Sequence, residues 1–69
     1  RDTSVFSRPA IPMQIKFGND VWIGAGASVL PGVEVAEGTV VGANSVVTKD
    51  TESYSVVVGA PARVVRFRE

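Results

Sequence analysis

The sequence predicts an all-β parallel solenoid, because three series of residues share one six-residue period. Branched or aromatic apolar residues recur at every sixth position: Phe17, Ile23, Val29, Val35, Val41 and Val47. Mostly smaller residues keep the same period four places later: Val21, Ala27, Val33, Thr39, Ser45 and Thr51. Residues that tolerate positive φ form the third series: Asp20, Gly26, Gly32, Gly38, Asn44 and Asp50. One period maintained over six repeats decides the fold class.

Each six-residue unit predicts a short strand followed by a tight corner. Alternation along a strand points Val21 and Ile23 to one side and Trp22 and Gly24 to the other. The inward side never switches from unit to unit, so consecutive strands cannot form hairpins and instead stack coil upon coil. A helix is excluded because inward spacings of two and then four residues do not fit a period of about 3.6.

The composition limits the size, the partners and the redox chemistry of the chain. Its 69 residues allow one small domain, and 45% hydrophobic with 20% charged residues indicates a globular chain. A formal net charge of zero argues against binding nucleic acid or membranes through bulk charge. The absence of cysteine excludes disulfides, and no apolar run approaches the roughly 20 residues of a membrane span. With no signal peptide visible, we expect a cytoplasmic protein.

The chain divides into three expected segments. Residues 1–14 predict a loop leading into the first coil, residues 15–54 the solenoid coils, and residues 55–69 a short irregular tail. The loop contains Pro9 and Pro12, and the sequence does not begin with methionine. Because a solenoid needs a cap at each end, we expect a C-terminal portion of a longer protein, whose upstream coils cover the N-terminal end.

Four segments resemble motifs of one known family. They are GNDVWIGAG at residues 18–26, LPGV at 30–33, VGANSVVTKD at 41–50 and GAPARVVR at 59–66. In these segments the sequence resembles the hexapeptide-repeat acetyltransferases, and most closely those that O-acetylate sugars, polysaccharides and antibiotics. The resemblance covers residues 15–68. It implies a left-handed parallel β-helix with three strands per coil.

Three strands per coil place residues 18 apart on the same face. The first face carries Trp22 and Gly24, then Val40 and Gly42, and the second carries Ser28 and Leu30, then Val46 and Thr48. The third carries Lys16 and Gly18, then Glu34 and Ala36, then Glu52 and Tyr54. Only the third face has ionised side chains, so we expect it to be solvated. The two apolar faces indicate burial in an oligomer, which the resemblance specifies as a homotrimer with active sites between neighbours.

The resemblance implies that six residues contact coenzyme A: Ala25, Ala43, Thr48, Lys49, Arg63 and Arg66. The two alanines would act through main-chain groups beside the pantetheine arm. The threonine and lysine would lie by the cofactor, with the lysine near its phosphates. The two arginines suit the pyrophosphate and 3′-phosphate because guanidinium groups match phosphate oxygens. Arg68 matches the family pattern less closely and is left out.

Each of these assignments has a plainer alternative. Outward glycines before the alanines can simply suit the crowded stacking of parallel coils. The segment from Thr48 to Asp50 can be an ordinary polar corner, and the arginines can form a solvated basic terminus. Trp22 can be an interface residue, a wall of the substrate pocket, or both.

No catalytic residue and no metal ligand can be assigned. Acetyl transfer from a thioester needs a general base and donors for the developing oxyanion. Members of the family use a histidine as the base, and the sequence contains none. We therefore expect the catalytic histidine to lie upstream, and the chain alone to be inactive. A backbone N–H near Ala25 is the candidate oxyanion donor.

The resemblance predicts an acetyl-CoA-dependent acetyltransferase that acts on a sugar or polysaccharide hydroxyl, this chain supplying the cofactor-binding part. The alternatives are an antibiotic or sugar-amine acetyltransferase and a non-catalytic β-helix that serves only in oligomerisation. A carbonic anhydrase of the same fold needs metal-binding histidines, which are absent here. We expect acetyl-CoA and a hydroxyl- or amine-bearing acceptor as partners, with no nucleic acid and no membrane span.

Overall fold

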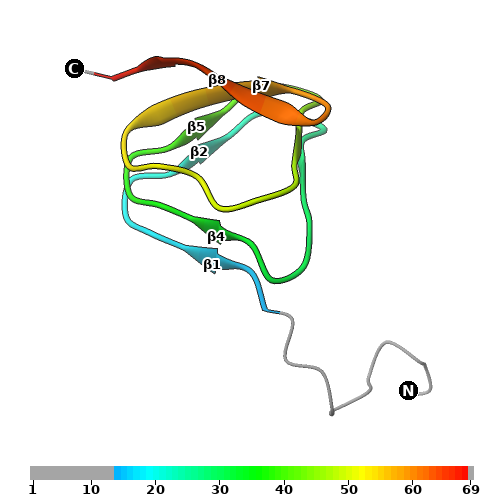
Figure 1. Cartoon of the computed structure of the whole chain (residues 1–69), viewed down its shortest axis with the longest axis horizontal. Helices are drawn as coiled ribbons and strands as arrows, with labels where there is room; N and C mark the ends of the chain where they lie inside the picture. Colours follow the sequence, from blue (N-terminus) through cyan, green and yellow to red (C-terminus); the bar gives the residue numbers. More distant parts are fainter. Residues whose placement is uncertain (1–13, 69) are drawn as a thin grey trace.

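The computed structural model describes residues 14–68, which form short parallel strands stacked in coils, finished by a longer hairpin (Figure 1). The strands are β1 Lys16–Phe17, β2 Trp22–Ile23, β3 Ser28–Val29, β4 Glu34–Val35, β5 Val40–Val41, β6 Val46–Val47, β7 Ser55–Gly59 and β8 Ala62–Phe67. The all-β parallel fold class is therefore confirmed. Apart from Gln14, the expected N-terminal loop over residues 1–14 lies outside the described residues. Residues 14–68 contain no helix long and apolar enough to cross a bilayer.

The strands form three sides, and each side is a separate sheet. We call them the β1 side (β1–β4), the β2 side (β2–β5–β7–β8) and the β3 side (β3–β6). Pairing joins Lys16 to Glu34, Trp22 to Val40 and Ser28 to Val46, so partners in the first two coils are 18 residues apart. This register confirms three strands per coil and the predicted stacking of the first two coils.

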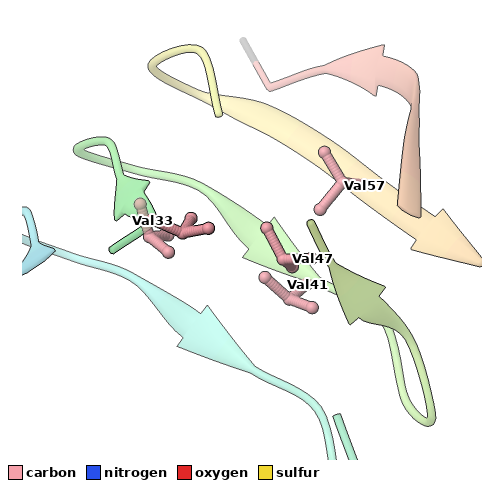
Figure 2. Close-up of a cluster of buried hydrophobic side chains, with 5 residues drawn as sticks. Val33, Val41, Val47 and Val57 are labelled. Atoms are coloured by element: carbon pink, nitrogen blue, oxygen red, sulfur yellow. The ribbon is translucent and has the colours of Figure 1, made fainter. Parts of the chain in front are cut away.

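The core consists of inward side chains of the second and third coils. Val33, Val35, Val41, Val47 and Val57 are at most 5% exposed, and Figure 2 shows them gathered between the strands. The first coil differs, because the inward side chains of Phe17 and Ile23 remain 53% and 42% exposed. Within residues 14–68, no coil stacks on the free edges of β1, β2 and β3.

Buried hydroxyl groups between the coils are hydrogen-bonded. The hydroxyl of Ser45 accepts the Gly59 N–H at 3.0 Å, and the hydroxyl of Ser55 donates to the Glu52 carbonyl at 2.7 Å. Thr39 is fully buried and lies 2.9 Å from the Thr51 hydroxyl and 3.3 Å from the Glu52 carbonyl. The small polar residues of the inward series are therefore compatible with burial, since each has a partner.

Five of the six predicted corner residues adopt positive φ: Asp20, Gly26, Gly32, Gly38 and Asn44. The prediction is wrong for Asp50, and Tyr54 takes the left-handed conformation instead, with φ 62°. The reason is that the third coil is two residues shorter than the others. Val40 pairs with Val56 and Val41 with Val57, a spacing of 16 residues.

The shortened coil also overturns the expected place of Glu52 and Tyr54 on the third face. Tyr54 stands at the corner above Gly38, and its N–H donates to the Glu37 carbonyl at 2.8 Å. No third strand covers β4; the Thr51 main-chain N–H donates to the Glu34 carbonyl at 3.1 Å, and two side chains accept the N–H groups. A carboxylate oxygen of Asp50 accepts the Glu34 N–H at 2.8 Å, and the Thr51 hydroxyl accepts the Ala36 N–H at 2.9 Å.

The chain ends in an ordered hairpin rather than the irregular tail expected over residues 55–69. β8 runs antiparallel to β7, with Val58 opposite Arg63, Val56 opposite Arg66 and a bulge at Val56/Val57. The physical reason is that valine-rich segments on both sides of Gly59 favour strands, with the glycine (φ 103°) beginning the turn between them. Ala62 packs against the core.

We predict that Thr51→Val destabilises the fold by about 1–3 kcal/mol, because the substitution removes the hydroxyl that links Ala36 and Thr39. Thr51→Ser keeps a hydroxyl, so its free energy of unfolding should fall much less. Urea denaturation of the two variants against the parent chain measures the difference. Equal stabilities for the valine and serine variants would show that the hydroxyl is not needed to finish the β1 side.

The single tyrosine of the sequence provides a second test. The negative charge of Glu37 raises the pKa of the Tyr54 phenol, and a hydrogen bond between the two side chains adds to the rise. We predict that Glu37→Gln lowers this pKa toward its ordinary value, measured from phenolate absorbance during alkaline titration. Glu52→Gln is the matched control and should leave the titration unchanged. An unchanged titration in Glu37→Gln contradicts the placement of Tyr54 at this corner.

Candidate functional site

Ala25 and Ala43 stack directly on one another at the corner between the β2 and β3 sides. Each follows a strand of the β2 side, and the Asn44 N–H donates to the Ala25 carbonyl at 2.9 Å. Both alanines are exposed. Gly59 ends β7 above them and continues the same corner into the third coil. The structure therefore brings together the first two residues proposed for cofactor contact.

The main-chain N–H groups of Ala25 and Ala43 are available to a ligand. Within residues 14–68, neither donates to a protein acceptor. Backbone N–H groups are strong donors that must otherwise be satisfied by water. Both donors belong to exposed residues with small side chains, so they can donate to the carbonyl oxygens of an extended amide-bearing arm. The candidate oxyanion donor at Ala25 is one of this pair.

The glycines before these alanines have a structural role as well. A Cβ atom on Gly24 would lie 2.6 Å from the backbone nitrogen of Ala43, which is too close for any real contact. A Cβ atom on Gly42 would come too close to one atom, Cγ1 of Val58 at 2.5 Å, whereas the Ser45 hydroxyl and the Val57 carbonyl would be in ordinary contact. Close stacking of the coils thus requires glycine at position 24, while at position 42 a neighbouring side chain can move.

Thr48 and Lys49 lie at the other edge of the β3 side. Both are exposed and follow directly after β6, whereas Ala43 precedes that strand. The length of β6 therefore separates them from the alanine corner within one chain. Placed as they are, the threonine and lysine cannot share a small contact patch with the two alanines of their own chain.

Lys49 and Arg63 line the same pocket, of about 250 Å³, under the C-terminal hairpin. Its apolar lining is Val47, Val57, Ala62 and Val64. Asp50, Thr51 and Glu52 complete its polar lining. The pocket therefore combines two cations, Lys49 and Arg63, with two carboxylates and an apolar lining. Within residues 14–68, no group of three or more acidic residues is arranged to hold a metal ion.

Arg66 lies on the outer face of the β2 side. The pairing of neighbouring strands aligns Trp22, Val40, Val56 and Arg66 in one row across four strands. Residues in one row point to the same face of a sheet. The tryptophan at the far end of this row is 65% exposed, so the row offers an aromatic ring and a guanidinium on one open face. Arg63, opposite Val58, is exposed on the same strand.

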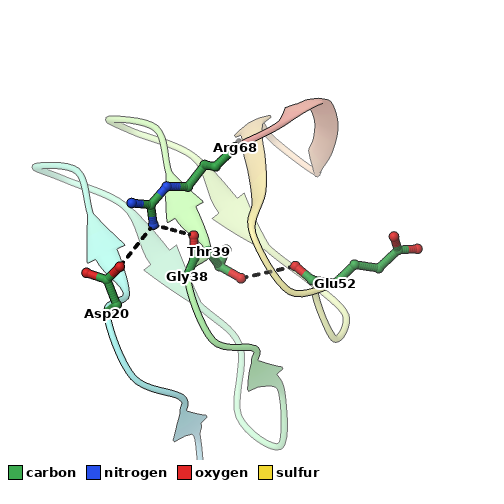
Figure 3. Close-up of polar contacts among 5 residues, drawn as sticks. All are labelled: Asp20, Gly38, Thr39, Glu52 and Arg68. Atoms are coloured by element: carbon green, nitrogen blue, oxygen red, sulfur yellow. Dashed lines mark hydrogen bonds and ion pairs between the residues drawn. The ribbon is translucent and has the colours of Figure 1, made fainter.

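Sequence reasoning missed Arg68. Its Nη1 donates to the Gly38 carbonyl at 2.8 Å and lies 3.4 Å from a carboxylate oxygen of Asp20 (Figure 3). The contact with Asp20 spans 48 residues of sequence, so no local pattern points to it. Asp20 and Gly38 could be aligned from the repeat, but their shared partner could not.

Comparison with known proteins identifies the repeat as that of a known protein family. Residues 15–49 match the bacterial transferase hexapeptide (six repeats) model. The chain is 51% identical over 51 residues to chloramphenicol acetyltransferase of Agrobacterium fabrum, an alignment that covers 74% of this chain and 24% of that protein. The chain thus spans about a quarter of the length of this relative.

Solved acetyltransferase structures share the fold. A maltose O-acetyltransferase from Clostridium difficile superposes with a TM-score of 0.77 at 45% identity, over 80% of this chain and 29% of that one. A galactoside acetyltransferase in complex with coenzyme A superposes with a TM-score of 0.75 at 45% identity, over 77% of this chain and 26% of that one. The arrangement of residues 14–68 is therefore one that occurs in acetyltransferases.

We predict that Gly24→Ala destabilises the fold by about 2 kcal/mol or more, because the new methyl group meets backbone that cannot move without separating two coils. Gly42→Ala, the matched position one coil later, should cost about 1 kcal/mol, since Val58 can change rotamer. Thermal or urea denaturation compares the two. A larger loss in Gly42→Ala would contradict the close approach at Gly24.

Proposed function

This chain belongs to the bacterial hexapeptide transferase family, and we propose that the protein is an acetyl-CoA-dependent acetyltransferase acting on a sugar or polysaccharide hydroxyl. The observation that carries the proposal is the 45% identity to galactoside acetyltransferase, which was solved with coenzyme A. The relatives named above are all acetyltransferases, and two of them are named for a sugar acceptor. An antibiotic hydroxyl or a sugar amine is the alternative acceptor, supported by the similarity to chloramphenicol acetyltransferase.

The chain would hold coenzyme A through two kinds of contact. The free N–H groups of Ala25 and Ala43 suit the amide carbonyls of the pantetheine arm, which needs donors that carry no bulky side chain in the way. Lys49, Arg63 and Arg66 suit the phosphates, because ionised donors form the stronger hydrogen bonds to phosphate oxygens. Thr48 adds a hydroxyl beside Lys49. Acetyl-CoA supplies the acetyl group as a thioester.

The chemistry of transfer needs a general base, which we propose to be a histidine outside this chain. A general base must remove the proton from the acceptor hydroxyl as it attacks the thioester carbonyl. The sequence has no histidine. We place the base in the remainder of the protein, so this chain alone should be inactive. The role proposed for Ala25 is to donate its N–H to the oxyanion.

A homotrimer is part of the proposal. The outward side chains of Trp22 and Leu30, on the β2 and β3 sides, are 65% and 41% exposed, and those of Val40 and Val46 are half-buried. Exposed apolar faces of this kind favour association. Within one chain the alanine corner and the Thr48–Lys49 corner stand at opposite edges of the β3 side. In the proposed trimer the cofactor would lie between two subunits.

We predict that Arg63→Ala and Arg66→Ala each weaken binding of coenzyme A to the full-length protein by roughly 10- to 100-fold, the loss expected for a hydrogen bond between charged groups. Titration calorimetry with coenzyme A and with pantetheine separates the contribution of the phosphate contacts from that of the contacts with the pantetheine arm. Binding of pantetheine should not change, because it lacks the phosphates.

Lys16→Ala, a cation on the β1 side, is the matched control and should bind coenzyme A normally. Undiminished affinity in both arginine variants would remove the phosphate contacts from the proposal. No affinity for coenzyme A in the full-length parent protein would favour the oligomerisation module instead.

A further inference from the structure

We propose that Arg68 is a positioning residue for cofactor binding: it fastens strand β8 to all three coils and thereby holds in place the strand that carries Arg63 and Arg66. The inference rests on the proposed function and extends it to a residue that the cofactor itself does not reach.

Arg68 bonds to one corner of the β-helix at three successive levels. Its main-chain N–H donates to the Tyr54 carbonyl at 2.6 Å, in the third coil. Its Nη1 donates to the Gly38 carbonyl of the second coil at 2.8 Å and approaches the Asp20 carboxylate of the first coil at 3.4 Å (Figure 3). One arginine therefore joins every coil of the described chain.

These three partners are the same corner repeated. Asp20, Gly38 and Tyr54 all adopt positive φ, at 60°, 73° and 62°. The backbone conformation that turns the chain between the β1 and β2 sides thus recurs at each level. The bond to Gly38 is the strongest of the side-chain contacts, because it is short, is donated by a charged group and satisfies a carbonyl of a buried residue. The contact with Asp20 is longer and exposed, and it contributes less.

Apart from its pairing with β7, strand β8 has few contacts with the coils, and Arg68 supplies some of them. It is the edge strand of the β2 side and pairs only with β7. Residues 63–67 are all exposed. At its start, Ala62 packs against the core, and just beyond its end Arg68 is again half-buried. The strand is thus fixed at both ends, and both proposed phosphate ligands lie between them.

The bulge next to Val56 makes the second attachment important. A bulge leaves one residue unpaired and bends and twists the strand locally, so the pairing before it does not by itself set the direction of the residues after it. Arg66 lies on the far side of this bulge from Ala62, so packing at Ala62 does not determine its orientation. Pairing with Val56 places Arg66 in the ladder, and the contacts of Arg68 fix the end of the strand two residues further on. Ordering Arg66 in advance lowers the entropic cost of binding phosphate.

The prediction is that Arg68→Ala in the full-length protein raises the Kd for coenzyme A by roughly three- to tenfold. The KM for acetyl-CoA should rise by the same factor, while kcat at saturation stays unchanged. Pantetheine should bind Arg68→Ala and the parent equally. In Arg63→Ala/Arg66→Ala, adding Arg68→Ala should cause no further loss of coenzyme A affinity, because the residues it positions are gone.

Two further variants keep the test decisive. Arg68→Lys retains one cationic donor for Gly38 and should recover part of the affinity, even if Arg68→Ala does not fold. Asp20→Asn keeps a residue that tolerates positive φ and removes only the weak ion pair, so it should bind coenzyme A almost as the parent does.

The outcomes separate this inference from the proposed function. Normal coenzyme A affinity in Arg68→Ala, beside weakened Arg63→Ala and Arg66→Ala, overturns the positioning role alone. An equal loss for pantetheine, or a parallel fall in kcat, assigns Arg68 to general stability and also overturns it. Normal affinity in both Arg63→Ala and Arg66→Ala overturns the phosphate contacts and the positioning role together.

Discussion

The hydrogen bonds between successive coils are the constraint on which the rest of the structure depends. Each strand is only two residues long in the first two coils, so the ladder is continued through the corners as well. The Gly24 N–H donates to the Val41 carbonyl at 2.8 Å, and the Asn44 N–H donates to the Ala25 carbonyl at 2.9 Å. Because corners and strands share one ladder, neither can shift without the other. This is why Gly24 has no room for a side chain, and why the Ala25 and Ala43 donors lie one above the other.

The same ladder explains what happens where the repeat ends. The third coil is two residues shorter and leaves β4 without a covering strand, so the side chains of Asp50 and Thr51 accept the N–H groups of Glu34 and Ala36 and the Thr51 N–H donates to the Glu34 carbonyl. The short coil also brings β7 onto β5 early enough for the chain to reverse at Gly59 and return as β8. The basic segment thus becomes the edge strand of the β2 side.

The six-residue period alone was sufficient for the all-β fold class, the stacking of the first two coils and five of the six left-handed corners. The period was sufficient because inward and outward side chains alternate within each short strand. The strand's own sequence therefore shows which side chains face the interior of the coil. The prediction failed at Asp50, Glu52 and Tyr54, because the spacing between paired residues of successive coils changes there from 18 residues to 16. It also failed for the tail, since the valine-rich segments flanking Gly59 do not continue the six-residue repeat.

The sequence by itself determined the coil, its inward series and the identities of the basic and small residues that the proposed cofactor contacts require. Only the tertiary structure decided how these residues are grouped. It stacks Ala25 on Ala43, places Lys49 in one pocket with Arg63, and aligns Arg66 with Trp22 across four strands. It also joins Arg68 to Asp20 across 48 residues. The physical reason is that a repeat specifies contacts between neighbouring coils, whereas the position of β8 follows from where the ladder ends and the chain turns back.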